Sequence, residues 1–227
     1  MNEIGKSISL RGVVFRERPR VAPELRRWVP NPTHDIFSKQ AIMIWFTSDL
    51  HFGHQNVIDY CARPFENVDE MNKFLLKRWN ATVADDDIVY VLGDLALMKA
   101  GAFLPIGSGL KGRKILIKGN HDSYSAAQYS SMGFLVFDEA VITLWNKRIR
   151  LSHYPHWPAA PELEDPNDLR YPDRRPPKDG KVLFHGHVHK KWVQHSAGDV
   201  FEINVGVDVW NYQPVAASTL EKWVCHR

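Results

Sequence analysis

The sequence has little cysteine and no long hydrophobic run, and both shortages narrow the kind of protein that it can be. Its 227 residues include only two cysteines, Cys61 and Cys225, too few for a disulfide framework or a zinc site built from thiolates. No apolar stretch approaches the roughly 20 residues that a membrane-spanning helix needs. The polar start of the chain lacks the apolar core of a signal peptide. We therefore expect a cytoplasmic protein without membrane contact.

Extremes of composition are also absent. Hydrophobic residues make up 44% of the chain and charged residues 24%, with 14 glycines and 14 prolines. These values are typical of a globular protein and exclude a disordered, collagen-like or coiled-coil chain. A chain of this length buries roughly 70–75% of the surface that it exposes when unfolded, so it forms a sizeable core without cross-links.

The net charge of +3 is unevenly spread along the chain. Residues 1–40 hold eight basic and four acidic side chains, so this Arg- and Pro-rich segment carries +4 and the rest carries −1. We therefore divide the chain into a basic N-terminal extension, residues 1–41, and a domain, residues 42–227. The segment has few aromatic residues that could stack on bases, which favours a solvated surface, with a nucleic-acid contact as the alternative.

Short apolar runs and one helical repeat predict the secondary structure. Strands are predicted at residues 9–15, 42–46, 88–92, 114–117, 141–145, 148–152, 181–185 and 201–207. Helices are predicted at residues 68–79, 123–132 and 215–224. Strands and helices alternate in the first half, and the second half is rich in strands. This pattern predicts an α/β body whose sheet, or pair of sheets, is covered by helices.

Polar motifs of similar composition follow five of these strands. They are Asp49-Leu50-His51, Gly93-Asp94, Gly119-Asn120-His121-Asp122, His153, and Gly186-His187-Val188-His189. Core packing does not explain five such clusters, whereas functional sites of open α/β sheets form at the ends of strands. The sequence therefore predicts one polar site to which all five motifs contribute.

Seven of these side chains form a candidate metal-binding set: Asp49, His51, Asp94, Asn120, His153, His187 and His189. Carboxylate, amide and imidazole ligands suit manganese, iron or zinc, and the lack of Cys ligands argues against a soft thiolate site. Seven ligands are too many for one ion but suit two ions that share a carboxylate. Two ions roughly 3.5–4 Å apart promote in-line displacement at phosphorus. We expect two divalent ions, with Mn²⁺ favoured and iron or zinc as alternatives.

The five motifs, in this order, resemble the signature of the calcineurin-like metallophosphoesterases over about residues 42–215. The chain looks most similar to the short bacterial and phage-type predicted phosphoesterases, which share a segment like residues 43–56, an Arg63-Pro64-Phe65 motif, and a closing segment like residues 204–208. The resemblance implies a four-layer sandwich of two facing mixed β-sheets flanked by helices, with the metal site at one edge.

The resemblance also implies a role for each candidate ligand. The first ion would be bound by Asp49, His51 and His189, and the second by Asn120, His153 and His187. Asp94 would bridge the two ions. A hydroxide between the ions would then attack the phosphorus in line.

His121 and Asp122 are the candidate catalytic residues. By the same resemblance, His121 would bind phosphate or protonate the leaving oxygen, and Asp122 would orient and charge its imidazole. The chemistry agrees, because imidazole titrates near neutral pH and is well suited to give a proton to a leaving alkoxide.

Four further side chains are candidate substrate contacts, each with a structural alternative. His54 and Asn56 either face the pocket or cap the next helix. Arg63 either binds phosphate through a bidentate contact of its guanidinium or forms a surface ion pair. His156 begins the proline-rich residues 155–180, which we expect to form a rim or lid over the site because long loops of this kind are usually functional or disordered.

These features predict a hydrolase of phosphodiesters, with 2′,3′-cyclic nucleotides as a candidate substrate. A compact domain suits a small phosphoester, and a nucleotide is the simplest choice. A phosphomonoesterase that acts on nucleotides or proteins is the alternative. A nuclease would need a basic groove, which the charge of −1 after residue 40 does not indicate. A non-enzymatic scaffold is disfavoured because all five motifs are intact. The sequence does not determine the oligomeric state.

Overall fold

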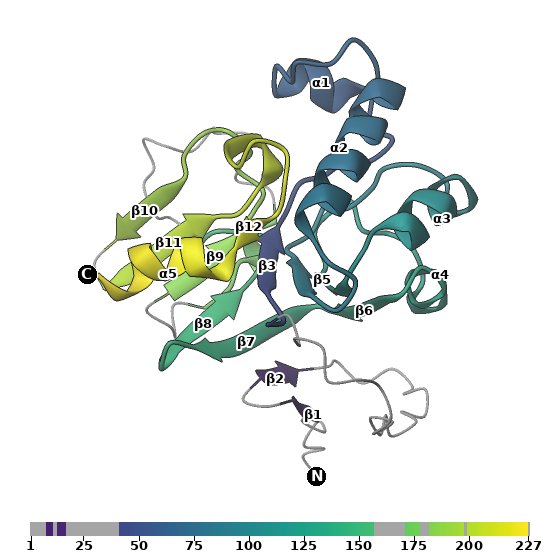
Figure 1. Ribbon diagram of the computed structural model, residues 1–227. Coiled ribbons are helices and arrows are strands. Elements are labelled where there is room, and N and C mark those ends of the chain that lie inside the picture. Colours follow the sequence, from purple (N-terminus) through teal and green to yellow (C-terminus); the bar gives the residue numbers. More distant parts are fainter. Residues whose placement is uncertain are drawn as a thin grey trace, which may run out of the picture.

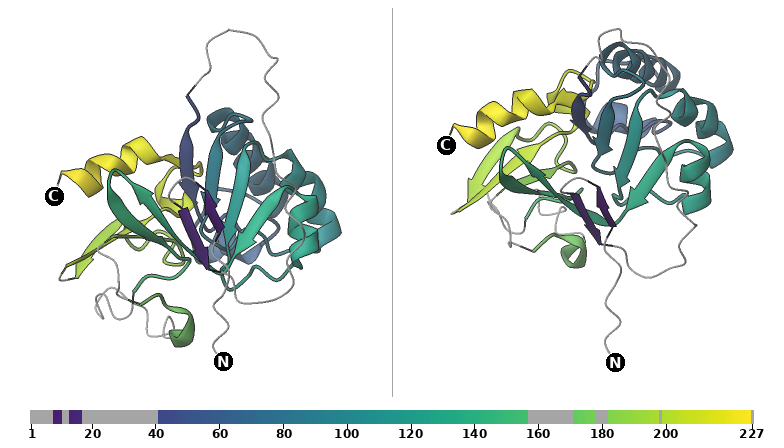
Figure 2. Two further views of the ribbon diagram at one scale, coloured as in Figure 1. Left: turned by 90° about the horizontal axis from the view of Figure 1, so that it is seen from below. Right: turned by 60° about the horizontal axis from the view of Figure 1, so that its bottom comes forward.

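The structure, a computed structural model, describes residues 8–10, 13–16, 41–156, 171–177, 182–197 and 199–226. Two mixed β-sheets face each other, and helices flank them (Figures 1 and 2). This arrangement confirms the predicted α/β fold. Most of residues 1–40, and of the proline-rich residues 155–180, lie outside the described residues, so the predicted rim or lid is not tested over most of its length.

The five-stranded sheet carries the first three polar motifs. Its strands run in the order β12 (Val215–Ala216), β3 (Ile44–Thr47), β4 (Ile88–Val91), β5 (Arg113–Ile117) and β6 (Phe134–Phe137). Strands β3 to β6 are parallel and β12 is antiparallel to β3. Parallel neighbours need a crossover, and helices supply each one. The carboxyl ends of β3, β4 and β5 therefore lie at one edge.

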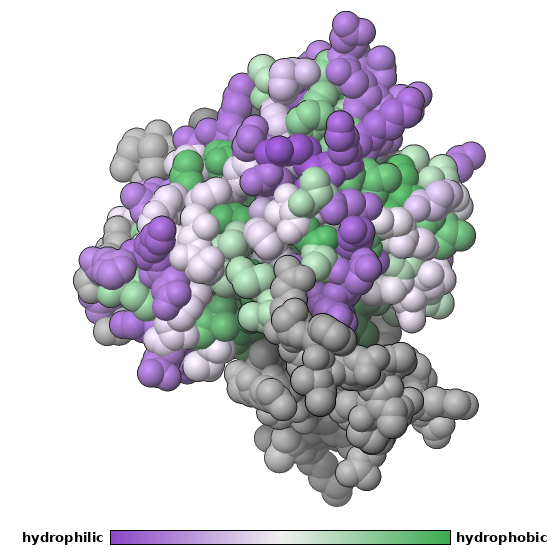
Figure 3. Space-filling view, in the orientation of Figure 1, coloured by the Kyte–Doolittle hydropathy of each residue, from purple (hydrophilic) through white to green (hydrophobic). Residues whose placement is uncertain are grey.

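Helices cover the outer face of this sheet. They are α1 (Asn56–Tyr60), α2 (Val68–Thr82), α3 (Ala100–Gly109) and α4 (Ala126–Ser131). The side chain of Asn67 caps α2 by accepting a hydrogen bond from Glu70 N. Hydrophilic residues gather over α1 and the start of α2 on the face seen in Figure 3. None of the helices in the described part of the chain is long and apolar enough to cross a membrane.

The seven-stranded sheet carries the last two motifs. Its strands run in the order β1 (Ile8–Leu10), β2 (Val13–Arg16), β7 (Glu139–Leu144), β8 (Lys147–Leu151), β9 (Val182–His185), β11 (Val200–Asn204) and β10 (Gln194–Ala197). Strands β8, β9 and β11 are parallel. The short 3₁₀ helices η3 (Pro172–Arg174) and η4 (Val207–Val209) and the last helix α5 (Ala217–Cys225) complete the fold.

Two hydrophobic cores hold these layers together. One lies between the two sheets and includes Phe46 and Tyr90 of the first sheet and Phe184 of the second. Phe46 stacks on Tyr90 and meets the edge of Phe184, with ring centroids 5.4 and 5.0 Å apart. The other core lies between the five-stranded sheet and its helices, around Trp79 and Phe103. Because successive side chains of a strand point to opposite faces, one apolar run supplies both cores.

Several elements differ from the sequence-based prediction. Helix α3 was not predicted, because it contains three glycines and Pro105 and lacks a polar face. Packing supports it instead, since Phe103 is fully buried. The strand predicted at residues 9–15 is a pair of strands, and β2 pairs antiparallel with β7 through Val14 and Val141 (Figure 2). Residues 13–16 thus extend the seven-stranded sheet, while the division at residue 41 stays a prediction.

Candidate metal centre

All seven predicted ligands lie together at the carboxyl ends of the parallel strands. Among the described residues, four groups of side chains place their donor atoms within 4.8 Å of one another: Asp49, His51 and His189; His51, Asp94 and His121; Asp49, Asp94 and His153; and Cys61, His189 and Asp208. The two remaining ligands adjoin His153, because Asn120 Oδ1 and His187 Nδ1 lie 3.1 and 3.2 Å from its Nε2 atom. The groups share members and so form one continuous cluster.

Asp94 occupies the centre of the cluster. Its Oδ2 atom lies 3.4 Å from His153 Nε2, 3.6 Å from His51 Nε2 and 3.9 Å from His121 Nε2. Its Oδ1 atom accepts a hydrogen bond from the His121 backbone amide at 2.9 Å. Three imidazoles from three loops therefore surround one buried carboxylate, which is the arrangement expected of a shared ligand.

The backbone at these positions is unusual. Five of the candidate ligands have positive φ angles: Asp49 (56°), His51 (54°), Asp94 (52°), His187 (71°) and His189 (48°). This left-handed conformation is uncommon for residues other than glycine, and such residues cluster at functional sites. Hydrogen bonds hold two of the turns together, since Asp49 N donates to Gly93 O at 3.1 Å and His51 N to Asp94 O at 3.0 Å.

The glycines of the motifs allow the turns to approach one another. A Cβ atom on Gly119 would lie within 2.7 Å of the Asp94 backbone nitrogen, and one on Gly186 would collide with the Ser48 side chain. Any larger residue would push the Asn120 and His187 turns away from Asp49 and Asp94. In both motifs the glycine therefore allows the close approach that brings the following ligand, Asn120 or His187, into the cluster.

Burial and charge shift the pKa values of the cluster. Burial lowers the pKa of His51 well below its usual value. Burial would lower that of His153 too, but the Asp94 carboxylate overcomes it and raises the pKa of His153 to about 9. Burial would raise the pKa of Asp94, yet its interactions with His153 and His51 hold that pKa well below the usual value. The site thus favours an ionised Asp94 carboxylate beside His153, and bound cations would favour the same ionised form.

A buried ion pair supports His189 from behind. Asp208 Oδ2 lies 2.9 Å from His189 Nδ1, and both Asp208 oxygens lie 2.8 Å from nitrogens of Arg63. Arg63 also donates to the carbonyl oxygens of Asp49 at 2.7 Å and Leu50 at 3.0 Å. One guanidinium therefore connects His189 to the loop after β3. Burial would lower the pKa of His189, but the Asp208 hydrogen bond overcomes it and raises that pKa to about 11.

This geometry corrects both readings of Arg63. The side chain is completely buried, so it forms neither a surface ion pair nor a contact with substrate. Its donors are occupied by Asp208 and by two backbone carbonyls. The sequence had not singled out Asp208 as a functional residue. The only available signal was its position in the closing Asn204–Asp208 segment, because the ion pair joins residues 145 positions apart.

Asp122 also differs from expectation. Its carboxylate accepts hydrogen bonds from the backbone amides of Asp94 and Gly119 at 2.8 Å and of Leu95 at 3.0 Å. The carboxylate therefore joins the loops after β4 and β5 and is directed at the backbone, not at the His121 imidazole that it was predicted to orient. Burial and the nearby Asp94 charge raise the pKa of Asp122.

The remaining predicted contacts separate into near and distant residues. His54 adjoins the cluster, with Nδ1 3.2 Å from His51 Nδ1 and its ring centroid 5.7 Å from that of His121. Asn56 is exposed at the first turn of α1, where Gln55 is the capping residue. His156 is buried and contacts Pro176 O through Nδ1 and Glu202 through its backbone amide, so the structure does not place it as an exposed substrate contact.

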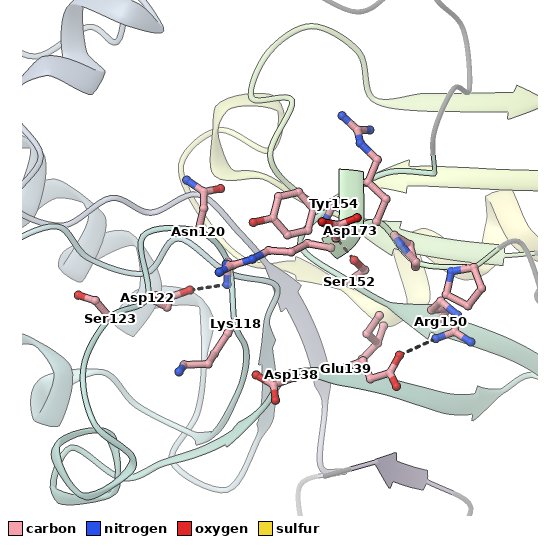
Figure 4. A pocket seen from close by; sticks show the side chains of 16 residues that line it. Lys118, Asn120, Asp122, Ser123, Asp138, Glu139, Arg150, Ser152, Tyr154 and Asp173 are labelled. Atoms are coloured by element: carbon pink, nitrogen blue, oxygen red, sulfur yellow. Dashed lines mark hydrogen bonds and ion pairs between the residues drawn. The ribbon is translucent and has the colours of Figure 1, made fainter. Parts of the chain in front are cut away.

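A cleft of about 740 Å³ opens beside the cluster (Figure 4). Asn120 and Asp122 line it together with Lys118, Tyr154 and Arg174, so one candidate ligand of the second ion, Asn120, borders the cleft. Its volume falls within the roughly 300–1,000 Å³ typical of small-molecule sites. The arrangement allows a phosphoester to reach the cluster while the rest of the molecule occupies the cleft.

The donor set fits divalent metal ions. Two ligands bound at roughly 2.0–2.2 Å to one ion lie about 3.0–3.5 Å apart, and the spacings around Asp94 and His153 are close to that range. His51 Nε2 is buried and has no hydrogen-bond partner among the described residues, although Asp94 lies nearby. A buried nitrogen of this kind needs a partner, and an ion would supply one.

Comparison with known proteins identifies relatives over most of the chain. Residues 42–217 match the calcineurin-like phosphoesterase superfamily domain. An uncharacterised protein of Methanocaldococcus jannaschii is 35% identical over 193 residues, or 80% of this chain and 90% of that protein. The gene 66 protein of Mycobacterium phage L5 is 32% identical over 73% of this chain and 86% of its own length. A solved structure of a protein of unknown function from Aquifex aeolicus is 29% identical, with a TM-score of 0.63, and the match covers 80% of this chain and 99% of that one.

Proposed function

Because the chain belongs to the calcineurin-like phosphoesterase superfamily, we propose that it is a binuclear metal-dependent phosphodiesterase of small substrates such as 2′,3′-cyclic nucleotides. One observation carries the binuclear part of the proposal. The Asp94 carboxylate lies between two sets of ligands, with His51 Nε2 at 3.6 Å on one side and His153 Nε2 at 3.4 Å on the other. A single carboxylate in this position is suited to bridge two cations.

In this proposal each ion takes three ligands in addition to Asp94. Those of the first ion are Asp49, His51 and His189, and those of the second are Asn120, His153 and His187. Divalent ions bound there, most simply Mn²⁺, would supply an activated water and would stabilise negative charge on the phosphoryl oxygens. The protein keeps the ligands in place through the Arg63–Asp208 pair and the strained turns described above.

His121 is the proposed general acid. Its side chain is about one-third exposed, unlike the buried rings of His51 and His153 around the same carboxylate. Its Nε2 atom lies 3.9 Å from Asp94 Oδ2, so the ring reaches the cluster while it still faces solvent. Proton transfer from this nitrogen to the leaving oxygen would complete the cleavage. We assign Asp122 a supporting role, because its hydrogen bonds fix the turn that carries His121.

A panel of substrates tests the reaction class. The full chain is loaded with Mn²⁺, and hydrolysis of a 2′,3′-cyclic nucleotide, bis-p-nitrophenyl phosphate and p-nitrophenyl phosphate is measured with and without chelator. We expect chelator-sensitive cleavage of the diesters to exceed that of the monoester. Preference for the monoester would favour the phosphatase alternative. No hydrolysis of any phosphoester by protein that holds its ions would contradict the proposed function.

A further inference from the structure

Tyr154 lies in the wall of the cleft, directly beside the proposed second-ion ligands. It follows His153 in the chain, and its ring centroid is 4.9 Å from that of His153 and 5.0 Å from that of His187. Only 3% of the residue is exposed. Figure 4 shows the ring between Asn120 and Asp173, with the hydroxyl on the side of Asn120. A phosphoryl group bound at the second ion would therefore lie close to this hydroxyl.

The hydroxyl of Tyr154 is a buried polar group in a residue that lines the cleft. It is buried and makes no hydrogen bond of normal geometry with any residue that the structure describes. Leaving a buried hydroxyl unpaired costs about 1–3 kcal/mol, so such a group calls for a ligand. A phenol has an ordinary pKa of about 10, so its hydroxyl is protonated at neutral pH and can donate a hydrogen bond. A ligand that offers an acceptor at this point would supply the missing partner.

Arg174 approaches the same point from another part of the chain. It comes from η3, and its guanidinium carbon lies 5.6 Å from the centroid of the Tyr171 ring. The Tyr171 ring in turn lies 5.7 Å from Tyr154. Tyr154 and Arg174 both line the cleft, so the two side chains face the same space. Arg174 is exposed at the cleft and can change rotamer as a ligand enters.

These two side chains provide donors of complementary kinds. A phenol donates one directed hydrogen bond, and a guanidinium donates several while carrying a positive charge. The guanidinium has no acceptor, whereas the phenol can also accept a hydrogen bond. Their preferred common ligand is therefore an oxyanion, and the neighbouring metal ligands make a phosphoryl oxygen the natural choice.

We propose that Tyr154 and Arg174 form an oxyanion subsite that binds a non-bridging oxygen of the scissile phosphoryl group on the second-ion side of the cleft. The inference rests on the proposed function and adds two substrate-binding residues to it. Inorganic phosphate, the simplest group with the same oxygens, should occupy the same subsite. Binding of phosphate can therefore be measured even without a known physiological substrate.

The main test removes the hydroxyl alone. In Tyr154→Phe the ring remains, so we expect both ions to stay bound and the affinity for inorganic phosphate to fall roughly 10–100-fold, as for the loss of a hydrogen bond to a charged group. Calorimetric titration of the metal-loaded chain with phosphate measures this change, and mass spectrometry counts the ions. Tyr90→Phe is the matched control, because Tyr90 is equally buried but lies in the core between the sheets.

Arg174 provides a second test that does not disturb the core. Arg174→Met should weaken phosphate binding and raise KM for each substrate that is cleaved, and Arg174→Lys should restore part of both. Arg113→Met is the control, since Arg113 forms an exposed ion pair with Asp86 and does not line the cleft. Unchanged phosphate affinity in both Tyr154→Phe and Arg174→Met would overturn the subsite. Loss of an ion from Tyr154→Phe would also overturn it, because the tyrosine would then act by holding the ligands.

The two proposals fail in different ways. A wild-type chain that holds two ions and binds phosphate, but cleaves no phosphoester, contradicts the proposed function and leaves the subsite measurable by titration. A wild-type chain that cleaves phosphoesters, but whose Tyr154 and Arg174 variants match it in KM and in phosphate affinity, contradicts only the subsite.

Discussion

The two halves of the candidate metal centre are built in opposite ways. Behind His189, Asp208 and Arg63 form a buried ion pair, and Arg63 also donates to the Asp49 carbonyl, so we call this the supported half. Near His153, which is itself buried, Asn120 and Tyr154 form part of the wall of the cleft. Asp94 belongs to both halves.

This difference separates two tasks. A buried network of charged hydrogen bonds holds a ligand in one orientation, and it leaves little room for a substrate. A half with a ligand in the wall of a cleft can receive the substrate. We therefore expect changes in the supported half to act through metal occupancy and changes beside the cleft to act through substrate binding and turnover.

Asp94→Asn should have the largest effect, because it removes the charge that both halves share. We expect at least one ion to be lost and hydrolysis to fall further than in His121→Ala or Asp208→Asn. Metal content by mass spectrometry and hydrolysis of a nitrophenyl diester measure both effects. Asp86→Asn, at an exposed carboxylate, is the control. Full occupancy of both ions in Asp94→Asn would contradict its role as a bridge.

His121→Ala should reduce turnover without removing ions. We expect a fall of roughly 10²–10⁴-fold, the range for loss of general acid catalysis. Nitrophenolate leaves readily without a proton and a sugar alkoxide does not, so the defect should be larger for a nucleotide diester than for a nitrophenyl diester. An equal defect for both substrates would indicate phosphate binding instead, and a lost ion would make His121 a ligand.

Asp208→Asn tests the supported half directly. The substitution weakens the hydrogen bond to His189 Nδ1 and leaves Arg63 with an unpaired charge. We expect the affinity for one ion to fall roughly 10–100-fold, as is typical when such an outer partner is lost, while the other ion is retained. Metal titration of the apo chain measures the two affinities. Asp59→Asn on α1 is an exposed control. An equal loss of affinity for both ions would contradict the distinction between the two halves.

Asp87→Asn should leave both halves intact and change only stability. The Asp87 carboxylate accepts hydrogen bonds from Ala84 N, Met43 N and Trp45 Nε1, each at 2.9 Å. Burial would raise the pKa of Asp87, but these three hydrogen bonds overcome that effect and lower it. We expect Asp87→Asn to lose about 1–3 kcal/mol of unfolding free energy at pH 7.

The pH dependence of that loss follows from the direction of the shift. A lowered pKa in the folded state stabilises the fold above the unfolded pKa, and this contribution disappears as pH falls through the folded value. The gap between wild type and Asp87→Asn should therefore narrow below about pH 4, the ordinary value for Asp. Urea unfolding at pH 7 and pH 3 measures the gap, with Asp86→Asn as the control. A gap that is constant with pH would mean that charge plays no part.

Much of the fold and of the candidate centre is predictable from local sequence. The apolar runs that end in Asp94 and Asn120 correspond to β4 and β5, and the helical repeat of residues 68–79 corresponds to the larger part of α2. Helix α3 was missed because its glycines and Pro105 disfavour a helix locally, while contacts of Phe103 with the core stabilise it. Packing overrides intrinsic preference at such a place.

Local patterns were enough to show which side chains assemble, but the groups behind and beside them depend on how the whole chain packs. Polar residues that follow parallel strands meet at one sheet edge, so Asp49, Asp94 and Asn120 could be grouped from the sequence. The pairing of Arg63 with Asp208, 145 residues away, and the direction of the Asp122 carboxylate toward backbone amides depend on contacts between distant loops. A short stretch of residues fixes where a strand ends, whereas the partners of a buried charge depend on every segment that surrounds it.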